Sequence, residues 1–384
     1  MSRVRLFGSL CGMVFLVNFA RIVFAPFVGV FMDVFGVQEG TIGLVVTLAW
    51  VGSASLRLPT GYLLTKVPRH YVVLGAGMVL TAASVFIATA ASVPAVMAGA
   101  FAMGLASGAY FVAGNPLVSE LFPDRVGRSL GVHGMAAQFG AVLAAPIVSL
   151  AVVYDWRFVF FGTGVAAATI TLLIFLTARR ADLPDAGTRD RDFFGAARNE
   201  WRIILTGVLM VGAVGFVWQG VFNFYEQYML SKGLPEAFAR NALTVLFGAG
   251  VPAFLISGRL VDRLPHVPYI LGVIGTFLAS VFALVLSSNL LVVVFLSAAV
   301  GFAIHALFPA MDTYLLDTLP DATRSSAYAF YSASMMLVQA GGASAVGTLV
   351  ERGFSYDAVF GGLLLILLAV LLLLVGLERA GRLP

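Results

Sequence analysis

Apolar runs of about 20 residues recur along the entire chain, and they limit its fold more than any other feature. A run of this length crosses the hydrocarbon core of a bilayer as a helix. Of the residues, 60% are hydrophobic and 11% are charged, whereas a soluble domain carries about 25% charged residues. The chain is therefore predicted to be a membrane protein.

The spans are predicted to be helices and not the strands of a barrel. Barrel strands alternate apolar and polar residues, and a run such as LLLILLAVLLLLVGL does not. The first span is expected to be retained, because no small-residue cleavage site follows it closely. We predict an all-α membrane protein whose twelve transmembrane helices form two pseudo-symmetric six-helix bundles. The predicted spans cover about residues 7–31, 41–63, 71–91, 94–117, 129–152, 157–178, 203–229, 239–261, 268–288, 290–316, 326–350 and 358–377.

One charged segment, residues 179–200, divides the spans into two groups. We predict an N-terminal six-helix bundle at 1–178, a cytoplasmic linker at 179–200 and a C-terminal six-helix bundle at 201–384. Lys and Arg gather in the loops on the side of this linker and of both termini. The opposite side holds Arg157, Lys232, Arg240 and Arg352. Because Lys and Arg favour the cytoplasmic side, we expect an integral protein of the cell membrane with both termini in the cytoplasm.

The two halves of the chain repeat a loop sequence. GYLLTKVPRHYVVLG from Gly61 and GRLVDRLPHVPYILG from Gly258 share their Gly and Pro positions. Ser119 and Leu316 have the same separation in the sequence as Gly61 and Gly258. With this offset, SELFPDRVGRSLG from Ser119 aligns with LDTLPDATRSSAY from Leu316 without a gap. Both halves begin on the same side of the membrane, which predicts parallel repeats with a substrate site between them near the midplane.

These loops resemble those of the major facilitator superfamily. Its loop signature, roughly Gly-x-x-x-Asp-Arg-x-Gly, follows helices 2 and 8, and the second copy here supplies Gly258, Asp262 and Arg263. The first copy keeps Gly61 but has Thr65 in place of the Asp, with Lys66 after it. NPLVSELFPDRVGRSLG and YDWRFVFF are similar to the helix 4–5 and helix 5–6 regions of that family. The resemblance covers essentially the whole chain and implies a monomeric secondary transporter that works by alternating access.

The repeated loops are expected to form a latch that closes the cytoplasmic side. Asp262 lies just past a helix end, within reach of a helix N-terminus whose free N–H groups attract an anion. Gly258 would let its helix approach a neighbour closely. The alternative is a set of charged loops that only determines topology. The expected latch residues, with Glu120 partnered by Arg128 and Asp317 by Arg324, are Gly61, Lys66, Glu120, Arg128, Gly258, Asp262, Arg263, Asp317 and Arg324.

Arg21 is the clearest candidate for a substrate contact. It lies roughly 20 Å along the first predicted helix, and Asn18 is one turn earlier on the same face. An ionisable side chain at this depth usually faces a wet cavity. A guanidinium in such a cavity is suited to bind a carboxylate or a similar oxyanion. The alternative is a structural Arg tied to backbone carbonyls or to an acidic neighbour.

The seventh predicted helix carries an aromatic stripe at Trp218, Phe222 and Tyr225. Such a stripe alone is typical of packing, but Gln219 and Glu226 on the same helix would not be tolerated by lipid. We expect the aromatic residues and Gln219 to contact substrate. Glu226 is the best candidate for a proton carrier, and the alternative is a hydrogen bond in an outer gate.

Four further polar residues lie within predicted spans. His305, Tyr331 and His133 are candidates for the substrate cavity, although a lone His is usually a satisfied contact between helices. Asp312 is a candidate for proton coupling or, near the inner helix end, for a structural role in the latch.

The sequence excludes several classes of function. It has no phosphate-binding loop for ATP, no metal-spaced His and Cys cluster and no catalytic pairing, so we expect neither an enzyme nor a cofactor. The net charge of +4 does not indicate a nucleic acid partner. The leading hypothesis is a proton-coupled transporter for a small organic anion such as a carboxylate. The alternatives are efflux of hydrophobic or cationic compounds and a non-transporting receptor or lipid-moving protein.

Overall fold

The structure, a computed structural model, consists of helices joined by short loops. It describes residues 2–180, 183, 193–261, 263–320 and 323–384. Within this part of the chain, twelve helices are long and apolar enough to cross a membrane. The predicted all-helical membrane fold with twelve spans is confirmed.

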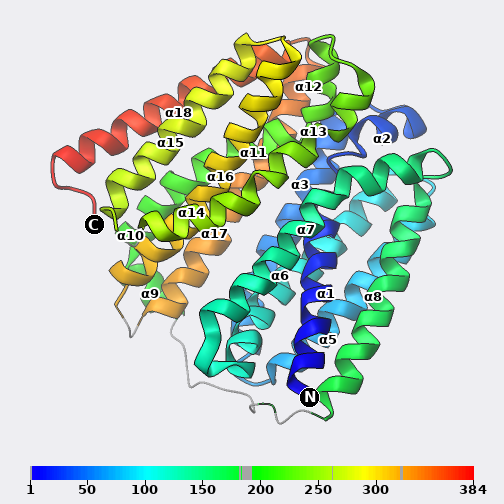
Figure 1. The fold of residues 1–384 in the computed structure, drawn as a ribbon, viewed down its shortest axis with the longest axis vertical. Coiled ribbons are helices and arrows are strands. Elements are labelled where there is room, and N and C mark those ends of the chain that lie inside the picture. Colours follow the sequence, from blue (N-terminus) through cyan, green and yellow to red (C-terminus); the bar gives the residue numbers. More distant parts are fainter. Residues whose placement is uncertain (1, 181–182, 184–192, 262, 321–322) are drawn as a thin grey trace. The chain divides into compact units, whose positions relative to one another are not determined.

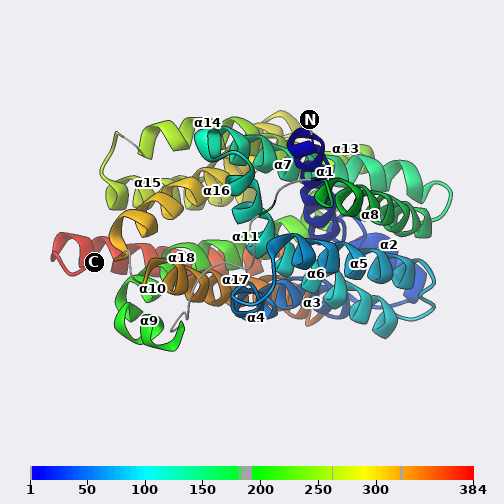
Figure 2. The ribbon, with the colours of Figure 1, turned by 90° about the horizontal axis from the view of Figure 1, so that it is seen from below.

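The chain folds as two compact units, and unit 1 comprises Met1–Phe35 and Leu48–Arg191. Its helices are α1 (Ser2–Ile22), α2 (Val28–Phe35), the second half of α3 (Glu39–Ser55), α4 (Arg57–Leu63), α5 (Arg69–Ala88), α6 (Val93–Leu121), α7 (Val126–Val152) and α8 (Arg157–Ala178). Helix α1 packs on α6, α7 and α8, and α5 lies beside α6 and α8 (Figures 1 and 2). Close approach depends on glycine, because a Cβ at Gly140 of α7 would lie 2.4 Å from the Phe15 carbonyl oxygen of α1.

Unit 2 comprises Gly36–Thr47 and Asp192–Pro384. Its helices are α9 (Phe193–Asn199), α10 (Trp201–Gly207), a π-helical segment (Val208–Gly212), α11 (Ala213–Asn223), α12 (Tyr225–Ser231), α13 (Glu236–Gly248), α14 (Gly250–Val261), α15 (His266–Leu286), α16 (Leu290–Thr318), α17 (Arg324–Glu351) and α18 (Tyr356–Arg379). The main packed pairs are α15 with α16, α11 with α17 and α14 with α16. Half of the predicted linker lies outside the described residues, and α9 occupies its end.

The first turns of α3 belong to unit 2, although they are far from it in sequence. The Thr47 hydroxyl donates to the Ala340 carbonyl oxygen of α17 at 2.8 Å. A Cβ at Gly43 would lie 2.7 Å from the Ala343 carbonyl oxygen, and one at Gly347 would lie 2.3 Å from the Glu39 carbonyl oxygen. Glycine on each helix therefore permits direct contact between the backbones of α3 and α17. The repeated loop sequences do not predict this contact.

The structure repeats at the spacing that the loop sequences predict. Helix α1 ends before Pro26 and continues as α2, and at the equivalent place α11 ends and continues as α12 after Phe224. Gly36 and Gly233 have the same separation in the sequence as Gly61 and Gly258, so we call them repeat mates. They follow these two short helices with φ of 63° and 73°. Only glycine adopts this left-handed backbone without strain. Both breaks put backbone polar groups near candidate site residues.

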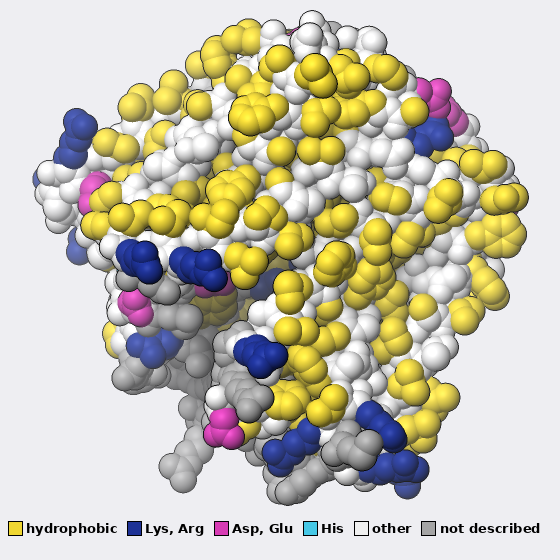
Figure 3. Space-filling model, viewed as in Figure 1, with side chains coloured by type: hydrophobic (Ala, Val, Ile, Leu, Met, Phe, Trp, Pro, Cys, Tyr) yellow, Lys and Arg dark blue, Asp and Glu magenta, His cyan; other side chains and the backbone are white. Residues whose placement is uncertain are grey.

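The surface agrees with a membrane environment. On the face in Figure 3, hydrophobic side chains cover the helices, whereas Lys and Arg side chains lie toward helix ends and loops. Side chains such as Leu291 and Phe295, 78% and 72% exposed, would be unfavourable in water and are favourable in lipid.

Candidate functional site

Arg21 lies in the last turn of α1, immediately before the break that contains Pro26. One guanidinium nitrogen, Nη2, donates to Asn18 Oδ1 at 2.6 Å. The Asn18 amide in turn donates to the Ala137 carbonyl oxygen of α7 at 2.7 Å. Asn18 therefore orients Arg21 and is itself fixed by a neighbouring helix, as expected for a supported binding group.

Two aromatic rings, Trp50 of α3 and Phe111 of α6, hold the guanidinium of Arg21. The Cζ atom of Arg21 lies 4.8 Å from the centroid of each ring. A cation over an aromatic face gains about 0.5–2 kcal/mol, the larger value when water is excluded. No local spacing in the sequence connects these two rings to Arg21, because the three residues lie on different helices.

Among the described residues of unit 1, no acidic side chain forms an ion pair with Arg21. Among the described residues, the ion pairs within 4.0 Å do not include Arg21, and its Nε is buried without a hydrogen-bond acceptor. The nearby positive charge of Arg57 adds repulsion. A cation removed from water without a counter-ion costs several kcal/mol, so this arrangement favours an anionic ligand.

Unit 2 contains an aromatic cluster formed by Trp218, Phe222, Phe247 and His305. The Trp218 ring lies 5.1 Å from Phe222, 5.6 Å from Phe247 and 5.9 Å from His305, centroid to centroid. Trp218, Phe222 and His305 are predicted from the sequence to contact substrate, whereas Phe247 of α13 is not. His305 Nδ1 is 2.6 Å from the Gly301 carbonyl oxygen, which fixes the ring within α16. The four rings are buried, and the Phe247 ring is nearly perpendicular to those of Trp218 and Phe222, so they form an apolar cluster inside unit 2.

Gln219 lies beside this cluster with Asn223. The Asn223 amide donates to the Gln219 side-chain oxygen at 2.9 Å, whereas Gln219 Nε2 and Asn223 Oδ1 are buried without a partner among the described residues. Unpaired buried amide groups are rare and call for water or a ligand.

Tyr225 and Glu226 belong to α12, beyond the seventh membrane span, which ends at Asn223. Tyr225 therefore leaves the aromatic stripe and forms a hydrogen bond with Ser297 of α16. The Glu226 carboxylate is buried and lies 3.7 Å from Arg240 Nε of α13. Burial raises the pKa of Glu226, and the positive charge of Arg240 opposes this increase.

The three remaining polar candidates have partners inside their own units. His133 Nε2 lies 2.9 Å from Tyr110 Oη, which donates to the Leu10 carbonyl oxygen. Asp312 accepts a hydrogen bond from Tyr328 at 2.8 Å, and the Tyr331 ring lies 5.8 Å from that of Tyr328. His133 thus joins α1, α6 and α7, which favours the structural alternative for this residue.

The sequence profile of the Major Facilitator Superfamily matches residues 10–290 and 242–383 of the chain. The chain belongs to the Major Facilitator Superfamily. A solved structure of the nucleoside transporter NupG, an alanine variant, has the same fold, with a TM-score of 0.80 at 12% identity over 99% of both chains. The inward-facing, unoccupied structure of a bacterial homologue of the human lysosomal transporter Spinster also shares it, with a TM-score of 0.76 at 16% identity over 97% of this chain and 95% of that one.

A curated relative is similar over a shorter stretch. The "Probable nitrate transporter NarT" of Staphylococcus aureus is 26% identical over 155 residues, which are 40% of this chain and 40% of that protein. The family and the structural relatives are transporters and not enzymes. The chain therefore shares its family and its fold with transporters.

In unit 1 of this Major Facilitator Superfamily protein, the expected latch residues form a different contact. Glu120 pairs with Arg69 of α5, with 2.7 Å between Oε1 and Nη1, and not with Arg128, which is exposed. Arg69 begins α5, so it reaches the end of α6 directly. Lys66 lies over the Tyr62 ring at 4.7 Å, and Gly61 is buried in α4.

In unit 2, Asp317 pairs with His266, with 3.7 Å between Oδ2 and Nε2. Arg324 Nε donates to the Leu319 carbonyl oxygen at 3.2 Å, Arg263 is exposed, and Asp262 lies outside the described residues. A Cβ at Gly258 would meet no heavy atom of the described chain within 4 Å, and the close approach expected at this residue stays a prediction. No neighbouring helix in the described part of unit 2 therefore packs against α14 at Gly258.

No group of three or more His, Cys, Asp and Glu is arranged to hold a metal ion in the part of the chain that the structure describes.

Proposed function

We propose that this protein is a secondary transporter that moves a small oxyanion, such as a carboxylate or nitrate, by alternating access with proton coupling. One observation carries the proposal: Arg21 is held on three sides by Asn18, Trp50 and Phe111, and no carboxylate of the described unit 1 neutralises it. A substrate anion would supply the missing charge.

The geometry of Arg21 favours a planar oxyanion. The Cζ atom of Arg21 lies over the rings of Trp50 and Phe111, Nη2 donates to Asn18, and Nε has no acceptor among the described residues. Carboxylate and nitrate oxygens lie in one plane and match two parallel N–H donors. The similarity to NarT, named for nitrate, supports the same ligand class.

Glu226 is the proposed proton carrier. Its carboxyl is buried, its pKa is raised by burial, and its nearest cation lies at 3.7 Å, longer than a close ion pair. Such a group can gain and lose a proton during a transport cycle. Asp312, which accepts a hydrogen bond from Tyr328, is the second candidate.

We also propose that both termini are cytoplasmic and that the protein lies in the cell membrane. The support is the concentration of Lys and Arg in the loops on the side of the termini.

Uptake by proteoliposomes tests the substrate. Purified protein is reconstituted, and uptake of labelled nitrate, acetate, lactate and phosphate is measured with and without a pH gradient. We expect Arg21→Ala to abolish saturable anion uptake and Arg21→Lys to leave a small fraction, since an ammonium lacks the planar fork. Arg179→Ala at the end of α8 is the control. Wild-type uptake of every tested anion by Arg21→Ala would disprove the proposal.

A second function, efflux of hydrophobic compounds, is favoured by the aromatic cluster of unit 2. Trp218, Phe222 and Phe247 form a group of apolar rings without a charge. Transport of apolar cations by the Arg21→Ala variant, together with no wild-type uptake of anions, would select this function.

A further inference from the structure

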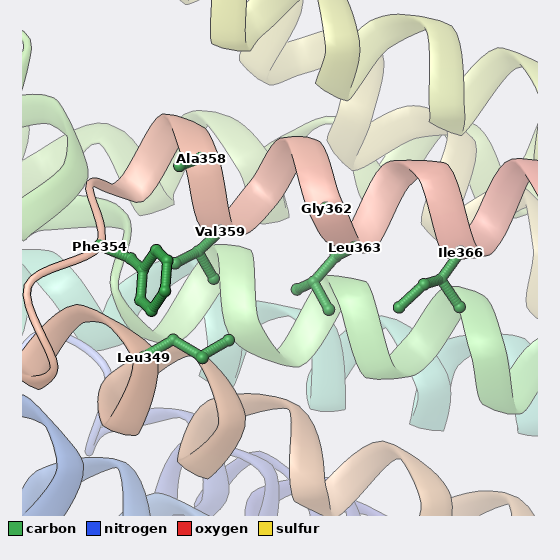
Figure 4. Close-up of a pocket in the computed structure, with 7 residues that line it drawn as sticks. All are labelled: Leu349, Phe354, Ala358, Val359, Gly362, Leu363 and Ile366. Atoms are coloured by element: carbon green, nitrogen blue, oxygen red, sulfur yellow. The ribbon is translucent and has the colours of Figure 1, made fainter.

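An apolar groove lies on the surface of unit 2, between α18 and the end of α17. It has a volume of about 250 Å³ and is lined by Leu349, Phe354, Ala358, Val359, Gly362, Leu363 and Ile366. Figure 4 shows Val359, Leu363 and Ile366 on the same side of α18, the side on which Leu349 of α17 lies. All of these side chains are apolar, so the groove does not belong to the anion site.

The groove is open to the hydrocarbon of the bilayer. It follows α18 from Ala358 to Ile366, about 12 Å at 1.5 Å per residue. This part of α18 is a membrane span, and Ile366 is 65% exposed. A cavity of about 150 Å³ already holds a benzene-sized molecule, so the groove has room for a segment of a flexible hydrocarbon chain.

Gly362 lines the groove without a side chain of its own. A Cβ at this position would meet no described heavy atom within 4 Å, and the same holds for Gly361, which does not line the groove. The missing side chain at Gly362 therefore leaves a hollow that no neighbouring helix fills.

One end of the groove lies at the loop that joins two membrane spans. Phe354 lies in the short loop between the spans that end at Glu351 and begin at Tyr356. Arg352 is in the same loop and is exposed, and the described residues give it no ion pair.

The acidic residues near this loop already have partners. Glu351 accepts a hydrogen bond from the Gly40 amide at 3.1 Å. Asp357 accepts one from Tyr228 at 2.7 Å and lies 3.5 Å from Lys232 Nζ. Arg352 is thus the basic group available for an external anion beside the groove.

We propose that this groove binds one phospholipid, with an acyl chain along α18 and the phosphate at Arg352. The acyl chain would form van der Waals contacts with the apolar lining, and the guanidinium would form charge-assisted hydrogen bonds with phosphate oxygens. The bound lipid would stabilise the contact between α17 and α18.

Native mass spectrometry of the full-length protein tests this site. The protein is purified in detergent and titrated with phosphatidylglycerol and, separately, with diacylglycerol. Gly362→Leu fills the groove and is expected to weaken binding of both lipids about tenfold. Gly361→Leu adds the same side chain one position away and is expected to bind like wild type. Arg352→Gln should weaken phosphatidylglycerol about fivefold and leave diacylglycerol unchanged.

Two results would overturn the proposal. Wild-type lipid affinity in Gly362→Leu would exclude the groove as the chain site. Equal loss of both lipids, or of neither, in Arg352→Gln would exclude the phosphate contact. Circular dichroism and gel filtration establish whether each variant is folded. If Gly362→Leu does not fold, Arg352→Gln still tests the phosphate contact, because it changes one exposed loop residue.

Discussion

Arg69 and Glu120 form an ion pair of 2.7 Å that connects the start of α5 to the end of α6. Their repeat mates, His266 and Asp317, lie 3.7 Å apart and connect α15 to α16 in the same way. The two units therefore use the same pair of positions to hold two adjacent helices at one end, although the basic residue differs. This contact lies within each unit and stabilises its helix pair.

Removing one partner of the Arg69 pair should weaken unit 1 modestly. Both side chains are partly buried, 14% and 27% exposed, so a double-mutant cycle with Arg69→Ala and Glu120→Ala should give a coupling of about 0.5–1 kcal/mol. Thermal unfolding of the detergent-solubilised protein measures it. Arg128→Ala is the control, and a coupling of Glu120 to Arg128 as large as that to Arg69 would contradict the structure.

The second pair should become stronger when His266 is replaced by arginine. Arg is always charged and presents parallel donors to a carboxylate, as Arg69 does in unit 1. We expect His266→Arg to raise the thermal midpoint and His266→Ala to lower it. The increase should disappear in Asp317→Asn, and its persistence there would show that the gain has another source.

The two rings around Arg21 should contribute to substrate binding. Trp50→Leu or Phe111→Leu removes a cation–π contact of about 0.5–2 kcal/mol, leaving the guanidinium less fixed. We expect KM for the transported anion to increase about three- to thirtyfold, while Trp50→Phe retains most of the affinity. Initial uptake rates over a range of substrate concentrations provide the measurement. An unchanged KM in both leucine variants would show that the two rings do not contribute to substrate binding.

The pH dependence of transport should follow Glu226. Burial raises the pKa of its carboxyl, so it takes up a proton at a higher pH than an exposed glutamate does. If this proton drives uptake, uptake falls as the pH rises through the pKa. Glu226→Gln cannot titrate and should abolish accumulation against a gradient while allowing exchange of substrate. Glu236→Gln, which removes the more exposed partner of Arg240, is the control. Accumulation driven by pH in Glu226→Gln would exclude Glu226 as the carrier.

Two glycines of unit 2 should differ in their tolerance of alanine. A Cβ at Gly301 of α16 would lie 2.0 Å from the Leu246 carbonyl oxygen of α13, whereas one at Gly258 would meet open space. We expect Gly301→Ala to destabilise the protein by about 1–3 kcal/mol because the backbones must separate. Gly258→Ala should be neutral or stabilising, since alanine favours a helix. Thermal unfolding compares them, and equal effects would contradict the packing of α13 on α16.

The sequence alone determined the membrane fold. Apolar runs long enough to span a bilayer must become helices, because lipid offers no partner for backbone polar groups. The repeated loops at Gly61 and Gly258 predicted two similar halves. Arg21 and Asn18 were identified for the same reason, since a charge within a span is costly and therefore noticeable in a single sequence.

Only the tertiary structure decided which side chains meet. Trp50 and Phe111 surround Arg21 from two other helices, and in an apolar sequence they cannot be distinguished from other aromatic residues. Glu120 meets Arg69 and not Arg128 because the start of α5 lies beside the end of α6. Gly258 carries the motif but faces open space, whereas Gly301 carries none and touches a backbone. The physical reason is common to all: a membrane specifies helices through local composition, but the rotation and distance of each helix are set by its neighbours.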